Sequence, residues 1–321
     1  MSETWIWDRY WHFDRIASCC DGAGASNYDD SVAAGWRAFF GGLPEGARIL
    51  DLCTGNGAAA LIAAGIGRRG AKGFEIVAVD QADIDPPAHV TRHAEDLAAI
   101  AFAPRTEVEA LPFPDGRFDA AISQYGIEYS DLARSLPEAV RVLAPGGRLR
   151  FVVHAADGDV AAGARTVIAE ADQLLGEIDL AGRASRCFEA LWAVERAGDE
   201  AARPRADAAF AAFQEALAET ARRIPQAHDP TMFRNSGAVL LDTFQRRGHF
   251  DLDQLLAKVG DIDTEIRAHR GRLVALVEAA LDAAQAEALA ERLRRAGADR
   301  AGSTPLMSGA ELIGHIVEAR F

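Results

Sequence analysis

The 321-residue chain lacks any apolar run of the roughly 20 residues that a membrane-spanning helix needs. Its beginning, Met-Ser-Glu-Thr-Trp-Ile-Trp-Asp, has no basic region followed by an apolar stretch, so no secretory signal is expected. Cysteine is scarce, because Cys19, Cys20, Cys53 and Cys187 are too few and too scattered for a disulfide framework. These absences predict a cytoplasmic protein.

Positive charge is also in short supply, because 48 acidic residues face 34 Lys and Arg and give a formal net charge of −14. An acidic chain is a poor match for a nucleic acid or an anionic membrane, and we expect neither as a partner. No metal site is expected either: His89 and His93 could share a helix face, but no further ligand lies near them in the sequence. A small molecule or a peptide is the expected partner, and the sequence leaves monomer and homodimer open.

Aromatic side chains gather in residues 1–46, which hold four of the five tryptophans. The pattern predicts two helices in this region, over 4–18 and 29–41. Two interpretations stay open: a packing layer over a sheet, or a lid that excludes water from a bound cofactor.

Residues 47–154 alternate between strand and helix patterns. Strands are predicted at 47–52, 74–79, 99–103, 118–123 and 148–154, and helices at 56–65 and 136–143. The second of these helices is expected to begin after Ser135, with Pro137 in its first turn. Continuous apolar strands between helices predict a parallel sheet that is covered on both faces.

The rest of the chain divides into two parts. Residues 155–282 show helical spacing, with breaks at Pro204, Pro225, Pro230 and Gly248. The alternating pattern then resumes, with a helix at 285–296 and two strands at 301–307 and 312–319 that would form a terminal hairpin.

The fold class that follows is α/β: a doubly wound, Rossmann-like, mostly parallel sheet with a C-terminal antiparallel hairpin strand and a helical cap insertion. Three regions are expected. They are an N-terminal helical lid (1–46), a core (47–154 with 283–321) and a helical cap that binds substrate (155–282).

The most informative segment, Ile-Leu-Asp-Leu-Cys-Thr-Gly-Asn-Gly at 49–57, is typical of a strand, a glycine turn and the start of a helix. Such a unit presents backbone N–H groups and the positive end of a helix dipole to a ligand. The acid at the strand end, Asp51, would repel a phosphate and favour an amino or sulfonium group. A second acid, Asp80, ends the next strand and can accept hydrogen bonds from both hydroxyls of a ribose. Together these features point to S-adenosylmethionine.

Four segments in this order resemble the class I S-adenosylmethionine-dependent methyltransferases of the broad methyltransferase-11/25 type. They are the segments at 49–57, 77–81, 108–119 and 141–147. One departure is Cys53, which stands where the family usually has its first glycine. The resemblance implies methyl transfer by in-line displacement to a small or medium organic molecule or a peptide, with oxygen slightly favoured as the acceptor atom.

The resemblance, together with the expected lid and cap, indicates the site residues. Cofactor contacts are expected from Tyr28, Asp51, Cys53, Gly55, Gly57, Asp80, Gln81, Glu107, Val108, Ser123 and Gln124. Substrate contacts are expected from Tyr10, Trp11, Glu128, Tyr129, Trp192 and Arg234. Tyr125 is expected beside the reactive methyl group. His154, where the fifth strand ends, could serve as a general base or could simply be a hydrogen-bonded histidine, since a deprotonated nucleophile needs no base.

Two other functions compete with this interpretation. A catalytically silent methyltransferase-like binding or regulatory protein would keep the same fold and cofactor residues. An NAD-dependent oxidoreductase would share the sheet and Asp80, but Gly55-Asn-Gly57 lacks the third glycine of the dinucleotide motif at its spacing, and Asp51 would repel the pyrophosphate.

Overall fold

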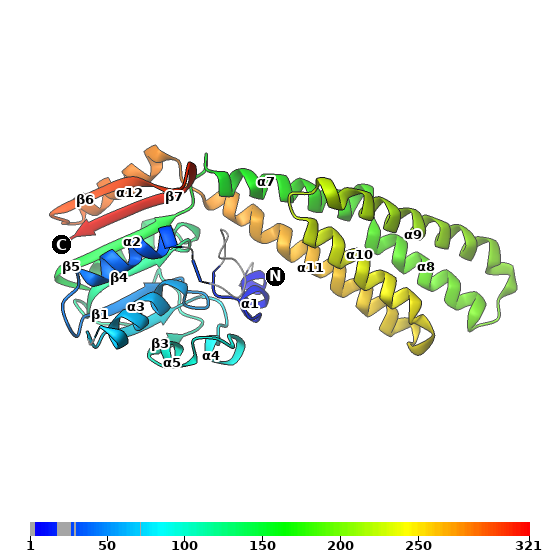
Figure 1. The fold of residues 1–321 in the computed structure, drawn as a ribbon, viewed down its shortest axis with the longest axis horizontal. Coiled ribbons are helices and arrows are strands. Elements are labelled where there is room, and N and C mark those ends of the chain that lie inside the picture. Colours follow the sequence, from blue (N-terminus) through cyan, green and yellow to red (C-terminus); the bar gives the residue numbers. More distant parts are fainter. Residues whose placement is uncertain (1–3, 18–26, 29, 71) are drawn as a thin grey trace. The chain divides into compact units, whose positions relative to one another are not determined.

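The computed structural model describes residues 4–17, 27–28, 30–70 and 72–321. The chain divides into two compact units, Met1–Ala162 with Ala275–Phe321, and Gly163–Val274. We call them the core unit and the helical unit and describe each by itself (Figure 1). None of the described helices is long and apolar enough to cross a membrane.

The described part of the core unit is built on a seven-stranded sheet with the order β3-β2-β1-β4-β5-β7-β6. The strands are β1 (Arg48–Leu52), β2 (Glu75–Val79), β3 (Ile100–Ala103), β4 (Phe118–Gln124), β5 (Leu143–Val153), β6 (Arg300–Ser308) and β7 (Glu311–Arg320). The first five strands pair in parallel, and β7 runs antiparallel to both β5 and β6. The predicted doubly wound sheet with a terminal hairpin is therefore confirmed.

Helices cover both faces of this sheet. The helices α2 (Asp30–Gly41) and α3 (Ala58–Arg69) share one apolar cluster with Ile49, whereas α6 (Leu132–Arg141) and α12 (Ala283–Arg295) share another with Leu50. Successive residues of β1 thus point to opposite faces, and both are fully buried. Full burial of one such side chain contributes about 1.5–3 kcal/mol.

The strand order fixes the place of a ligand site. The chain proceeds outward from β1 through β2 to β3 and then returns to the other side of β1 with β4 and β5. In open parallel sheets the carboxyl ends of the strands form a crevice where this order reverses. Here the reversal lies between β1 and β4. The short elements α1 (Thr4–Trp11), α4 (Pro86–His89), α5 (Ala94–Leu97) and the 3₁₀ turn η1 (Ile127–Tyr129) complete the core unit.

Several element boundaries differ from the prediction. The helix α1 ends at Trp11 and not at residue 18, because the Asn56 side chain binds the carbonyls of Trp11, Phe13 and Arg15, which a longer helix would use for its own backbone hydrogen bonds. Residues 18–26 lie outside the described part. The helix α6 begins after Asp131, whose carboxylate accepts the Ala133 N–H at 2.9 Å, so Pro137 lies inside the helix.

Two other boundaries moved for reasons of backbone geometry. The strand β5 already begins at Leu143, which pairs with Phe118; residues 144–147, which include the Pro-Gly-Gly segment, form an irregularity in register, and pairing resumes at Arg148 opposite Ala120. The helix α3 begins at Ala58, after Gly57 in a left-handed conformation (φ 84°), a geometry that glycine adopts without strain.

The helical unit, residues 163–274, contains no strand and is described in full. Its helices are α7 (Asp159–Asp172, which begins in the core unit), the π-turn η2 (Gln173–Glu177), α8 (Leu180–Glu195), α9 (Arg203–Arg223), α10 (Pro230–Gln245) and α11 (Leu252–Ala279, which ends in the core unit). Short 3₁₀ turns lie between the helices at η3 (Glu200–Ala202), η4 (Ile224–Gln226) and η5 (Arg247–His249). The predicted breaks Pro225 and Gly248 fall in η4 and η5, whereas Pro204 lies in the first turn of α9 and Pro230 begins α10. Phe188, Phe213 and Phe233 are buried between these helices.

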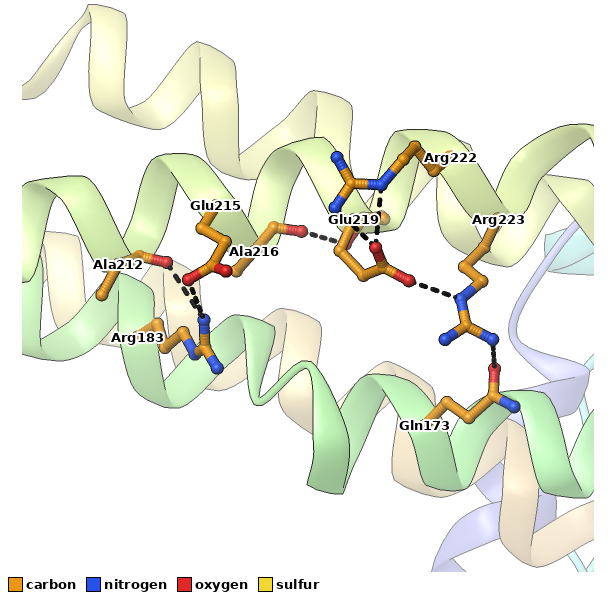
Figure 2. A network of polar contacts seen from close by, with 9 residues as sticks. Gln173, Arg183, Ala212, Glu215, Ala216, Glu219, Arg222 and Arg223 are labelled. Carbon is orange, nitrogen blue, oxygen red and sulfur yellow. Dashed lines mark hydrogen bonds and ion pairs between the residues drawn. The ribbon is translucent and has the colours of Figure 1, made fainter.

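Partly exposed ion pairs link side chains on the surface of the helical unit (Figure 2). Glu219 accepts hydrogen bonds from Arg222 and Arg223 on its own helix, and Arg223 also reaches Gln173 on η2 at 3.2 Å. Arg183 on α8 contacts Glu215 on α9 at 3.4 Å. Each of these charged side chains thus has an oppositely charged partner within the unit.

Candidate active site

Two cavities lie in the core unit at the carboxyl ends of β1, β2 and β4. The larger has a volume of about 120 Å³. It is lined by Trp7, Trp11, Cys53, Asp80, Gln81, Ala82, Thr106, Val108, Glu109, Tyr125, Gly126, Tyr129 and Ser130. The site therefore lies at the reversal point that the sheet order predicts.

The smaller cavity, of about 20 Å³, adjoins it. It is lined by Trp11, Ile16, Tyr28, Asp51, Cys53, Thr54, Ala58, Ala59, Gln124 and Tyr125. Trp11, Cys53 and Tyr125 line both cavities, so these three side chains lie where the two spaces meet.

Asp51 supplies the acid of the smaller cavity. It is the last residue but one of β1 and is only 1% exposed. Its Oδ2 accepts the Thr54 hydroxyl at 2.6 Å, and its Oδ1 has no hydrogen-bond partner among the described residues. Burial raises the pKa of Asp51 to about 7, although the Thr54 hydroxyl acts in the opposite direction. A buried oxygen without a partner costs free energy, so a ligand that donates a hydrogen bond here would be favoured.

Gln124 supplies a donor to the same cavity. This last residue of β4 is buried, and its Oε1 accepts the indole N–H of Trp36. That bond fixes the orientation of the amide, whose Nε2 finds no partner in the described part of the chain. The smaller cavity thus presents one free acceptor and one free donor.

Asp80 supplies the acid of the larger cavity. Its Oδ2 accepts the Gly55 N–H at 2.7 Å, and its Oδ1 accepts the Ala82 N–H at 2.9 Å. Burial raises the pKa of Asp80 to about 6, and these backbone donors partly oppose the shift. Each carboxylate oxygen has two lone pairs, so both can still accept a ligand hydroxyl.

Two residues between the cavities have left-handed backbone conformations, which are strained in residues other than glycine. Cys53 has φ 55° and Tyr125 has φ 52°. The small thiol at 53, where the family usually has glycine, is accommodated because position 126 is glycine: a Cβ there would come within 2.5 Å of the Cβ of Cys53. Such strain is concentrated at functional sites in proteins.

Aromatic rings form a continuous wall of the larger cavity. Trp7 packs edge-on against Tyr129, with 5.3 Å between ring centroids, and Trp11 and Tyr125 line the cavity beside them. Among the described residues, no Lys, Arg or His lines either cavity. The residues outside the description, 1–3, 18–26, 29 and 71, also include no basic side chain. The two cavities therefore combine acids and aromatic rings without a positive charge.

A buried histidine–carboxylate pair lies against this wall. Glu128 Oε1 accepts the backbone N–H of His154 at 3.0 Å and contacts its Nδ1 at 2.8 Å. The His154 ring stacks on Tyr125, with 4.2 Å between centroids, and packs edge-on against Tyr129. Nε2 of His154 and Oε2 of Glu128 have no partner among the described residues.

The structure brings most of the predicted cofactor residues together. Tyr28, Asp51, Cys53, Asp80, Gln81, Val108 and Gln124 line one or both cavities. Gly55 contributes its N–H to Asp80, whereas Gly57 only starts α3 and packs under Phe102. Ser123 is wholly buried and ties Leu52 to Ile127, so it supports the site from behind.

Other predicted residues do not line the cavities. Glu107 is exposed, because the extended backbone after β3 turns Thr106 and Val108 inward and the residue between them outward. Tyr10 lies outside with Arg15 over its ring, and Glu128 and His154 lie behind the two tyrosines. In the helical unit, Trp192 is half-buried beneath Arg196, and Arg234 is exposed.

Sequence reasoning missed several residues of the site. Trp7 is the clearest, because it lies four positions before Trp11 and therefore shares a helix face with it. Thr106 and Glu109 flank the predicted Glu107–Val108 pair and line the larger cavity together with Val108. No sequence signal pointed to Asn56 or Thr54, whose partners depend on the fold.

The comparisons with known proteins agree with this geometry. Residues 50–151 match the family model of a methyltransferase domain. The core unit contains a class I methyltransferase domain. The matched segment begins within β1 and ends within β5, so it includes both Asp51 and Asp80.

Two curated relatives and a solved structure give the extent of the likeness. A demethylmenaquinone methyltransferase of Thermus thermophilus is 43% identical over 105 residues, which are 32% of this chain and 44% of that protein. A 2-phytyl-1,4-naphtoquinone methyltransferase of Synechococcus elongatus is 32% identical over 146 residues, or 42% of this chain and 59% of that one. The match thus spans less than two thirds of each relative. An S-adenosylmethionine-dependent methyltransferase structure from Mesorhizobium loti is 25% identical, with coverage of 38% and 51% and a TM-score of 0.30.

Proposed function

We propose that the protein is an S-adenosylmethionine-dependent methyltransferase. The observation that carries the proposal is the presence of two buried acids, Asp51 and Asp80, in adjoining cavities whose described lining contains no basic side chain. A dinucleotide or another phosphate would meet only negative charge there, whereas a ligand with positive groups is favoured. The methyltransferase domain match over the same strands supports this choice.

The site residues fit the two ends of this cofactor. Asp51 would hold its ammonium group, and the free amide N–H groups of Gln124 would hold its carboxylate. Asp80 would accept the ribose hydroxyls. When bound, the cofactor supplies a methyl group on positively charged sulfur. Trp11 and Tyr125, which line both cavities, can stabilise such a charge through their ring faces and exclude water from it.

We propose a neutral, ring-shaped acceptor that carries a hydroxyl group. The aromatic wall of Trp7, Tyr125 and Tyr129 suits a flat ring, and the absence of a cation among the described lining residues gives no counter-charge to an anionic acceptor. The two curated relatives named above carry quinone-type names, which fits a ring. A ring oxyanion shares its charge with the neighbouring carbon, so oxygen and carbon are both possible acceptor atoms. Selection of the acceptor by the helical unit, residues 155–282 in the sequence analysis, stays a prediction.

The pair of Glu128 and His154 offers a way to remove the acceptor's proton. A carboxylate at Nδ1 favours the tautomer in which Nδ1 carries the hydrogen, which leaves Nε2 as a proton acceptor. Tyr125 and Tyr129 lie between this ring and the cavity, so we propose that acceptor binding displaces Tyr129. The residues would otherwise act by alignment and by exclusion of water.

Calorimetric titration of the full chain with S-adenosylhomocysteine, in parallel with NAD, tests the cofactor. We expect binding of the first and none of the second, and the reverse result would refute the proposal. Turnover with hydroxylated naphthalenes, with and without a carboxylate substituent, then tests catalysis and the charge of the acceptor. Formation of S-adenosylhomocysteine only with the neutral compound is expected. Binding without any turnover over a wide panel would instead favour a silent binding protein.

A further inference from the structure

One asparagine of the glycine turn binds the N-terminal arm, by which we mean residues 4–17. The Nδ2 group of Asn56 lies 3.0 Å from the carbonyl of Trp11, 3.4 Å from that of Phe13 and 2.8 Å from that of Arg15. Asn56 is wholly buried. Three carbonyls around one amide group hold a non-helical stretch of backbone in place, in a region where the chain has no regular structure of its own.

The same turn belongs to the cofactor site. Gly55, directly before Asn56, donates its N–H to Asp80 and packs so closely under Trp11 that a Cβ there would overlap the indole. Trp11 in turn lines both cavities. The position of the arm and the shape of the cofactor site are therefore fixed by neighbouring residues of one tight turn.

The arm has further tethers across the loops after β2. Asp8 accepts the N–H of Asp83 at 2.8 Å, and Asp14 accepts the hydroxyl of Thr91 at 2.6 Å. These outer contacts include exposed groups and compete with water, whereas the contact at Asn56 is buried and next to the ligand residues. Of these contacts, the one at Asn56 is therefore the one whose loss should change the cofactor site most directly.

We propose that the N-terminal arm is a lid over the cofactor and that hydrogen bonds from the Asn56 side chain hold it closed. These hydrogen bonds must break before the cofactor can leave. This inference rests on the proposed function. An asparagine with only a structural role would change the melting temperature of the protein and leave the kinetics of the bound cofactor unaltered, so rates of exchange decide between the two.

The first experiment measures the dissociation rate of S-adenosylhomocysteine by stopped-flow, with tryptophan fluorescence as the signal from Trp7 and Trp11. For Asn56→Ala we expect dissociation at least tenfold faster than in the wild type, with a smaller change in the association rate. Asn56→Asp should be at least as severe, because a carboxylate would face three carbonyls. Gln245→Ala, which removes an exposed amide on α10, is the control and should match the wild type.

A second experiment needs no folded variant. Trypsin cleaves after Arg15, whose carbonyl is bound by Asn56. In the wild-type protein, saturating S-adenosylhomocysteine should slow this cleavage at least tenfold if the arm closes over the ligand. Ligand binding without protection at Arg15, or an unchanged dissociation rate in a folded Asn56→Ala variant, would overturn the lid and leave the methyltransferase proposal intact. No binding at all by the wild type would refute the proposed function itself.

Discussion

The two buried acids of the core-unit cavities and the acids of the helical unit have opposite environments. In the core unit, Asp51 and Asp80 are buried with no cation beside them, and burial raises the pKa of both. In the helical unit, hydrogen bonds from Arg223 and Arg222 lower the pKa of Glu219, and a hydrogen bond from His269 lowers that of Asp229. These acids of the helical unit are thus paired with basic side chains, whereas the two buried cavity acids have no basic partner among the described residues and Asp51 keeps one oxygen without a hydrogen bond.

This difference separates the residues that stabilise the fold from those that carry function. Exposed ion pairs such as those in Figure 2 are screened by solvent and hold helices together with little selectivity. A buried carboxylate with an unpartnered oxygen destabilises the folded state, so its presence requires another explanation. Binding of a positively charged or hydroxyl-bearing ligand provides that explanation.

Removal of the ribose acid should have the largest effect. Asp80→Ala eliminates the two hydrogen bonds that the ribose hydroxyls would donate to a charged carboxylate, each contributing about 1.5 kcal/mol, so we expect about a 100-fold loss of affinity for S-adenosylhomocysteine. Calorimetry measures it. Asp83→Ala is the matched control, because Asp83 lies in the same loop but its carboxylate is bound to Arg105 and partly exposed. Equal affinities in a folded Asp80→Ala variant would contradict the assignment.

The histidine–carboxylate pair should matter for turnover but not for cofactor affinity. His154→Ala removes the proposed base and should lower kcat by about 100-fold. Glu128→Gln should lower kcat by at least about tenfold, because an amide can donate to Nδ1 and then favours the tautomer whose Nε2 carries a hydrogen. Steady-state kinetics with the acceptor measures both variants. If kcat is unchanged in His154→Ala, the pair has only a structural role.

Local patterns predicted the sheet well, because its strands are decided by residues close in sequence. The apolar runs of β1, β2 and β4 are each bounded by polar residues, and the terminal hairpin follows from two adjacent strands. The predicted start of α6 was wrong, because Asp131 caps the helix in place of Ser135. The Ser135 hydroxyl instead accepts a hydrogen bond from Ser130. Propensity cannot rank two capping residues whose side chains have other partners in the fold.

For the site, too, local pattern predicted some residues and could not predict others. The sequence pointed to Asp51 and Asp80, because each lies at or just after the carboxyl end of an apolar strand and the strand order brings such ends together. It misplaced Glu107, since the direction of a single loop residue depends on backbone angles and not on pattern. It missed Asn56 entirely, because the three carbonyls that it binds lie more than 40 residues earlier in the chain.

The buried acid of the smaller cavity should affect stability in a way that depends on pH. The pKa of Asp51 is near 7 in the folded state and near 4 when unfolded, so folding takes up a proton between these values and stability falls as pH rises through that window. Asp51→Asn removes this dependence. At pH 8 the free energy of unfolding of Asp51→Asn should be about 2 kcal/mol higher than that of the wild type, and this difference should disappear near pH 5.

Urea denaturation across this pH range provides the measurement, and Asp119→Asn is the control with the opposite sign. Arg48 lowers the pKa of Asp119 by hydrogen bonding, so that carboxylate stabilises the fold above pH 4 and loses the contribution as pH falls. Its replacement should destabilise the protein at pH 8. Parallel stability curves for Asp51→Asn and the wild type would show that burial of Asp51 has no cost.

The smallest effect is expected in the helical unit. Glu219→Ala removes bonds to Arg222 and Arg223, but both arginines remain at the surface, where water replaces the lost acceptor. We expect a slight fall in melting temperature at low salt, none at about 1 M salt, where exposed charges are screened, and an unchanged affinity for S-adenosylhomocysteine. Differential scanning calorimetry and titration measure these quantities. A marked loss of cofactor affinity would break the contrast between the units, because it would mean that an acid already paired within the helical unit also acts on the site.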